Sequence, residues 1–203
     1  GQLKAEYPDV YVHTHLSENK NEIAWVKELF PERKGYLDVY HHYGLTGAKS
    51  VFAHCVHLEE QEWDCMQQTN SAIAFCPTSN LFLGSGLFPL KKAWDKQVKV
   101  GLGTDIGAGT SFNQLQTLNE AYKVQQLQGE KLSAFEALYH ATLGGAKALS
   151  LDDRLGNFNI GKEADFVVLD LNATALQQLR QSRAKNIEDA FFALTMLGDD
   201  RNI

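Results

Sequence analysis

Segments with the pattern of β-strands alternate with segments with the pattern of helices four times between Val10 and Gln128. The predicted strands are residues 10–15, 50–57, 72–76 and 98–103. Apolar periodicity and capping residues predict helices over residues 21–30, 36–43, 59–69, 89–96, 113–128, 134–148 and 187–197, and a further apolar strand over residues 166–169. This alternation indicates parallel strands joined by helical crossovers, which is an α/β fold.

Polar side chains stand at the end of each predicted strand: His15, His54, Cys76 followed by Ser79 and Asn80, and Asp105. A (β/α)8 barrel gathers its reactive groups at these strand ends. A doubly wound sheet also binds ligands there, but it gives no reason for spreading His, His and Asp over separate strands. Four βα units make half a barrel, whose edges would be left open. We therefore expect either that the other half lies upstream in a longer protein or that the chain pairs with itself as a homodimer.

His15, His54 and Asp105 have the chemistry of a metal site. Neutral imidazole and carboxylate together bind divalent ions such as zinc. Glu18 follows His15 by three residues and is placed to act as a general acid and base. The alternatives are that Asp105 caps the following turn and that His54 is a packed core histidine. Their common placement at strand ends favours the metal site.

The other histidines are weaker candidates. His13 shares a strand face with His15 but lies farther from the strand end, so His15 is the better ligand and a contribution from His13 stays open. We expect surface, loop or packing positions for the remaining ones, which are His41, His42, His57 and His140.

Composition limits the partners and the compartment. A net charge of −6 argues against a nucleic-acid or anionic-membrane partner, since either calls for a basic patch. Cys55, Cys65 and Cys76 are odd in number and lack C-x-x-C spacing, which predicts buried free thiols in a reducing cytoplasm. No apolar run approaches the roughly 20 residues that span a bilayer, and no signal peptide is evident. The chain does not begin with Met, and we expect it to be a piece of a longer protein.

Several motifs together resemble the amidohydrolase superfamily, and within it the guanine deaminases. The motifs shared widely in the superfamily are His13-Thr14-His15-Leu16-Ser17-Glu18-Asn19, Ala53-His54, Cys76-Pro77-Thr78-Ser79-Asn80-Leu81 and Gly101-Leu102-Gly103-Thr104-Asp105. The narrower resemblance rests on the A-T-L-G-G-A run at residues 141–146 and the G-D-D-R-N-I run at residues 198–203. The similarity extends along nearly the whole chain.

The resemblance implies a set of roles for the strand-end residues. His15 and Asp105 would be zinc ligands, and Asp105 would also handle a proton. Glu18 would move protons between the attacking water and the purine ring, and His54 would lie beside substrate and water. His15, Glu18, His54 and Asp105 together would therefore contact guanine, whose exocyclic amino group is removed hydrolytically to give xanthine and ammonia.

The resemblance also implies a domain organisation. Residues 1–155 would form the C-terminal half of a TIM-like (β/α)8 metal-dependent hydrolase barrel, and residues 156–203 would return toward a small β-sandwich domain and end in the last helix. The first metal-binding H-x-H pair of the family and its purine-holding arginine segment are absent from this sequence. We therefore expect an incomplete site for one zinc ion and no activity of this chain alone.

Two other functions stay open at this stage. One is a related amidohydrolase that deaminates or dechlorinates another heterocycle. The other is a non-catalytic piece that serves only in assembly.

Overall fold

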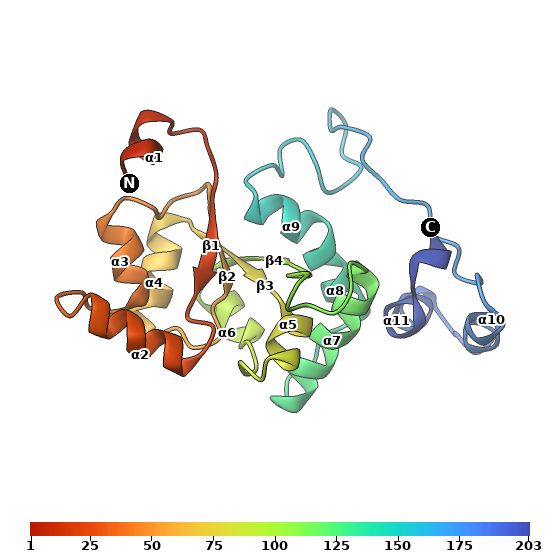
Figure 1. The fold of residues 1–203 in the computed structure, drawn as a ribbon. Helices are drawn as coiled ribbons and strands as arrows, with labels where there is room; N and C mark the ends of the chain where they lie inside the picture. The colour runs from red at the N-terminus through yellow and green to blue at the C-terminus, as the bar shows by residue number, and fades with distance from the viewer.

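The computed structural model describes all 203 residues and contains one parallel sheet covered by helices (Figure 1). Its strands, in the order β1-β2-β3-β4, are β1 (Val12–Leu16), β2 (Ser50–His54), β3 (Ala72–Phe75) and β4 (Lys99–Leu102). All neighbouring pairs are parallel, so the four carboxyl ends lie at the same edge of the sheet. The predicted α/β architecture is confirmed.

Eleven α-helices and one short 3-10 helix complete the chain. They are α1 (Gln2–Glu6), α2 (Lys20–Leu29), α3 (Tyr36–His42), α4 (Glu60–Thr69), α5 (Pro77–Phe82), α6 (Leu90–Asp95), α7 (Gln114–Leu127), α8 (Ala134–Ala141), α9 (Leu143–Ala148), α10 (Ala175–Gln181), α11 (Ile187–Leu197) and η1 (Asp200–Asn202).

The main hydrophobic core lies between one face of the sheet and the helices that follow its strands. Phe52 of β2 and Phe75 of β3 are fully or almost fully buried in it together with Trp63 of α4 and Phe88. The rings of Phe75 and Phe88 lie 4.8 Å apart between centroids. Aromatic packing of this kind fixes the sheet against its helices and so holds the strand ends in place.

The opposite face of β3 and β4 is covered by α9. Side chains alternate along a strand, so Val51, next to Phe52, faces this side and packs with Ala72 and Ala148. A Cβ atom on Gly101 would lie 3.1 Å from the Cα of Gly145. The close approach of α9 to β4 therefore depends on the missing side chain of Gly101.

The helix predicted over residues 134–148 is two helices, α8 and α9. Thr142 between them has φ −128° and ψ −101°, which is outside the helical region. Its hydroxyl donates to the carbonyl of Leu138 at 2.7 Å, a local bond that competes with the helical ladder. The break turns α9 under the sheet, and periodicity alone does not reveal such a turn.

The strand predicted over residues 166–169 is wrong. The segment has no strand neighbour, and Phe166, Val167 and Val168 are 60–74% exposed. A strand is stabilised by pairing, and an apolar sequence without a neighbour in the chain does not form one. Figure 1 shows this part as an irregular connection from α9 to α10.

The sequence interpretation also missed α5 and α10. Pro77 stands at the first turn of α5, where its missing N–H costs nothing. α10 begins with a capping box in which Thr174 and Gln177 satisfy each other's backbone N–H groups. Both signals are local and readable in the sequence.

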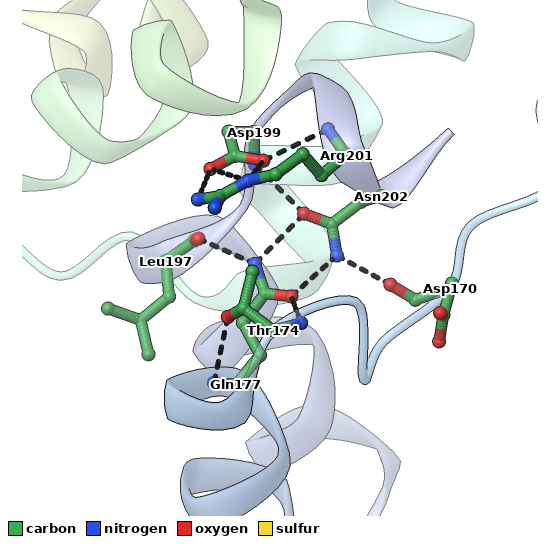
Figure 2. A network of polar contacts seen from close by, with 7 residues as sticks. All are labelled: Asp170, Thr174, Gln177, Leu197, Asp199, Arg201 and Asn202. Atoms are coloured by element: carbon green, nitrogen blue, oxygen red, sulfur yellow. Dashed lines mark hydrogen bonds and ion pairs between the residues drawn. The ribbon is translucent and has the colours of Figure 1, made fainter.

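A buried polar network ties the C-terminal helices together (Figure 2). The Gln177 amide donates to the carbonyl of Leu197 at 2.8 Å and to Oδ1 of Asn202 at 2.9 Å. Asn202, fully buried, donates back to Gln177 and to the carbonyl of Asp170. The network fixes α10 against the end of α11, which itself packs on α7 and α8.

Candidate metal centre

Three predicted residues meet at the carboxyl edge of the sheet. His15 lies on β1, His54 ends β2, and Asp105 follows β4 by three residues. One ligand atom from each residue lies within 4.8 Å of the other two. The parallel register brings these residues together although they are far apart in sequence, because it aligns the ends of successive strands.

The backbone at these positions is strained. Ser17, His54 and Asp105 have φ values of 48°, 71° and 49°, in the left-handed region that non-glycine residues seldom adopt. The backbone therefore turns sharply at His54 and at Asp105 themselves, and two residues after His15. Strain of this kind persists only where the surrounding structure enforces it, and it concentrates at functional sites.

The orientation of His54 is set by Asn80. Nδ1 of this buried imidazole lies 2.8 Å from Oδ1 of Asn80, an acceptor, so Nδ1 carries the proton and donates. Nε2 is buried and has no hydrogen-bond partner. It faces the carboxylates of Glu18 at 3.7 Å and Asp105 at 3.8 Å, and the ring stacks on His15 with centroids 5.3 Å apart.

These residues fit a divalent metal ion. The imidazole of His15 and the carboxylate of Asp105 are donors that suit zinc, and the free lone pair on the buried Nε2 of His54 lies beside them. The second nitrogen of His54 is held by Asn80, as is usual for histidines at metal centres.

Glu18 is held both at its carboxylate and at its backbone N–H. The Ser85 hydroxyl donates to its Oε1 at 2.9 Å. Its backbone N–H donates to Oε2 of Glu22 at 3.0 Å, and the hydroxyl of Tyr36 donates to the other oxygen of Glu22 at 2.9 Å. Burial raises the pKa of Tyr36, so this hydroxyl stays a donor. Glu18 is thus oriented toward Nε2 of His54.

A glycine supports the loop that carries Asp105. The N–H of Gly109 donates to the carbonyl of Asp105 at 2.6 Å. A Cβ atom at Gly109 would lie 1.8 Å from the carbonyl oxygen of Thr104. The tight return of this loop therefore accepts only glycine.

Cys76 is buried, as predicted, and it is no nucleophile. Burial and the neighbouring Asp105 carboxylate raise the pKa of its thiol to about 12. All three cysteines are free thiols as predicted, but Cys65 is only partly buried, so the prediction of burial is wrong for this residue. A thiol with so high a pKa remains protonated near neutral pH and is unreactive.

The remaining histidines lie outside the centre. His13 is exposed on β1, and His41 and His42 are exposed at the end of α3. His57 lies in the loop after β2, where Nε2 is 2.8 Å from the carbonyl of Ser85. The expected packing role of His140 is confirmed: it is buried, Nδ1 lies 3.0 Å from the carbonyl of Val100, and burial lowers its pKa.

Two supporting residues were not assigned a role from the sequence. The sequence predicts Asn80 only as a polar residue after the third strand, and it predicts no role at the site for Ser85. Both follow β3, whose carboxyl end lies at the same edge as the candidate ligands. Their place after a strand is the one signal that points to them.

Comparison with known proteins decides the family. The profile of the Amidohydrolase family matches residues 2–197. The chain belongs to the amidohydrolase family.

Within the family, the chain is highly similar to guanine deaminases. The chain is 70% identical over 202 residues to guanine deaminase of Escherichia coli K12, an alignment that covers 100% of this chain and 46% of the relative. The solved structure of the E. coli enzyme superposes with a TM-score of 0.98 over 100% of this chain and 47% of that chain. The chain thus spans about half the length of the relatives that it matches.

Two further amidohydrolase structures carry ligands. Guanine deaminase from C. acetobutylicum, with guanine bound in its active site, is 32% identical, with a TM-score of 0.87 over 99% of this chain and 48% of that chain. An adenosine deaminase from Xanthomonas campestris with bound zinc is 26% identical, with a TM-score of 0.83 over 98% of this chain and 44% of that chain. Zinc is therefore a metal that relatives of this chain bind.

None of the helices combines the length and the apolar character that crossing a bilayer demands.

Proposed function

We propose that the protein formed with this chain hydrolyses guanine to xanthine and ammonia. The observation that carries the proposal is the convergence of His15, His54 and Asp105, with ligand atoms within 4.8 Å of one another and Glu18 beside them. The 70% identity to E. coli guanine deaminase supports guanine as the substrate.

One zinc ion would be held by His15 and Asp105. When bound, zinc supplies a nucleophile near neutral pH, because it lowers the pKa of water. His54 would orient the substrate and the attacking water through Nε2, which is free because Asn80 holds Nδ1.

Glu18 and Asp105 would move the protons. The Glu18 carboxylate, fixed by Ser85 and facing the centre, would take a proton from water and deliver it to the purine ring nitrogen. Asp105, 3.8 Å from His54 Nε2, would accept the second proton and pass it to the amino group, which then leaves as ammonia. Together with His15, these residues would contact guanine.

We further propose that the metal site of this chain is incomplete and that the chain alone does not turn over guanine. Residues 1–155 would form the second half of the barrel, and residues 156–203 would return toward a β-sandwich domain. The chain offers two ligands, His15 and Asp105, whereas a zinc site takes three or four protein ligands.

Zinc content tests the ligand assignment. We would measure zinc per chain by elemental analysis, on protein purified without a metal-affinity tag, for the parent and for His15→Ala, Asp105→Ala and His54→Ala. We expect zinc to fall in the first two variants and to persist in His54→Ala. His13→Ala, on the same strand and exposed, is the matched control. Equal zinc in all variants would refute the assignment.

A chimera tests the substrate. In it, this chain replaces the matching segment of E. coli guanine deaminase. We expect release of ammonia from guanine, loss of turnover in Glu18→Gln, and no turnover by the isolated chain. Preference for adenosine, cytosine or a chlorinated triazine would assign the chain to a different amidohydrolase reaction.

We also propose a homodimer and a cytoplasmic compartment. The outer edges of β1 and β4 have no strand neighbour within the chain, and open edges favour pairing. Three free cysteines suit a reducing compartment. Light scattering tests the dimer: a constant monomer mass over a wide concentration range would refute it.

A further inference from the structure

A cavity of about 250 Å³ lies outside the candidate metal centre, between α2, the loop after it, and the first residues of α3 and α4. None of the three candidate metal residues lines it. Part of its wall is apolar and comes from Ile23, Val26 and Phe30 together with Val39. This wall suits the apolar body of a small ligand.

The rest of the wall is rich in cations. Lys20, Lys27, Arg33 and Lys34 line the cavity, in a chain whose net charge is −6. The ammonium groups of the three lysines form no ion pair. These positive charges therefore remain available to a ligand.

Arg33 adds a separate indication of a ligand. Its Nε is buried and has no hydrogen-bond partner. Its guanidinium forms two long ion pairs, from Nε to Oε1 of Glu32 at 3.6 Å and from Nη1 to Oδ2 of Asp38 at 4.0 Å, and neither is a hydrogen bond. A buried guanidinium N–H without an acceptor is unfavourable, and an anionic oxygen is the strongest acceptor that a ligand can offer to it.

The two acidic residues of the cavity do not fill this role. Oε1 of Glu62 accepts from the N–H of Leu37 and its Oε2 from the N–H of Glu59, both at 2.9 Å. The Glu59 side chain in turn caps the N–H of Glu62 at the start of α4. Burial raises the pKa of Glu62. Both carboxyl groups are thus occupied by backbone donors.

We propose that this cavity binds a small organic anion, with an apolar or aromatic body against Ile23, Val26 and Phe30 and a phosphate or carboxylate group facing Arg33 and the lysines. The volume lies just below the roughly 300–1,000 Å³ of typical ligand pockets, so the ligand is smaller than a dinucleotide.

The cavity is connected with Glu18 by two hydrogen-bonded paths. Tyr36, a lining residue, donates to Glu22, which accepts from the N–H of Glu18. His57, also a lining residue, is hydrogen-bonded to the carbonyl of Ser85, whose hydroxyl donates to Oε1 of Glu18. An occupant is thus placed to shift Glu18. Any effect on catalysis rests on the proposed function, whereas binding does not.

Binding of phenyl phosphate to the 203-residue chain tests the proposal. Inorganic phosphate and benzyl alcohol serve as probes of the two halves of this ligand. Calorimetry is expected to show tighter binding of phenyl phosphate than of either half, and amide NMR is expected to show shifts at Gly35, Tyr36 and Glu18. Binding should weaken as salt is raised, because exposed charge pairs are screened.

The double variant Lys27→Gln/Lys34→Gln is expected to weaken phenyl phosphate binding about tenfold, since each exposed charge pair contributes a few-fold. The matched control Lys131→Gln/Lys185→Gln removes two exposed lysines that do not line the cavity and should leave affinity unchanged. Equal affinity in both double variants, or binding of benzyl alcohol as tight as that of phenyl phosphate, would overturn the proposal. Zinc and guanine do not enter this assay, so its failure is distinct from failure of the proposed function.

Discussion

Replacement of Asn80 by leucine tests the support of the metal centre. Asn80 and His54 are 1% and 0% exposed, and they share one hydrogen bond of 2.8 Å. Asn80→Leu keeps the size of the side chain but removes the acceptor. Nδ1–H of His54 then has no partner, and its burial keeps water from replacing the lost acceptor.

The expected loss of stability follows from this orphaned donor. A buried donor left without an acceptor costs about 1–3 kcal/mol. For a chain of this size, each kcal/mol lowers the melting temperature by about 2–4 °C. Ser79→Ala is the matched control, because Ser79 is adjacent, equally buried, and its hydroxyl has no hydrogen-bond partner. We expect Ser79→Ala to change stability far less.

A double-mutant cycle isolates the bond between the two side chains. Urea unfolding, followed by tryptophan fluorescence, would be measured for Asn80→Leu, His54→Phe and the double variant. We expect a coupling free energy of about 1–3 kcal/mol, since substitutions at residues in direct contact do not have additive effects on stability. In the His54→Phe background, Asn80→Leu should lower the free energy of unfolding only slightly.

An additive cycle would refute the reasoning. It would mean that Asn80 stabilises the fold by packing alone and does not hold the His54 ring. In the chimera with E. coli guanine deaminase, the same variant is expected to lower guanine turnover while zinc content stays unchanged, because His54 is proposed to orient the substrate and the attacking water and not to hold the metal.

Three further predictions follow from other parts of the structure. Burial lowers the pKa of His140, so the unfolded chain takes up a proton near pH 6.5 that the folded chain does not. The free energy of unfolding should therefore fall below that pH by up to about 1.4 kcal/mol per pH unit, until the pKa of the folded state is passed. Urea unfolding at pH 7 and pH 5 should show a smaller loss of stability in His140→Gln than in the parent. The control His41→Gln, which replaces an exposed histidine, should show the full loss. Equal losses in the two variants would contradict the role of His140. Gly109→Ala forces a Cβ into the carbonyl of Thr104 and should weaken zinc binding at least about tenfold while circular dichroism stays unchanged. Asn202→Ala removes the centre of the C-terminal network in Figure 2 and should cost about 1–3 kcal/mol, seen as faster hydrogen exchange in the last two α-helices; exchange unchanged there would show that the network is dispensable.

Local sequence patterns determined most of the barrel portion. The alternation of strands and helices, and the choice of His15, His54 and Asp105, needed only periodicity and the rule that parallel strands share a carboxyl edge. Capping residues were equally informative: Asn19 accepts from the N–H of Glu22 and begins α2. These features are encoded within a few residues, so the sequence alone carries them.

The tertiary structure alone decided the rest. The strand expected over residues 166–169 has apolar residues of the right kind but no neighbour to pair with, and pairing is a property of the whole chain. The free lone pair of His54 arises because Asn80, 26 residues away, takes its other nitrogen. The left-handed backbone at His54 and Asp105 likewise has no local signature. Residue types are local, whereas neighbours and orientations are set by packing.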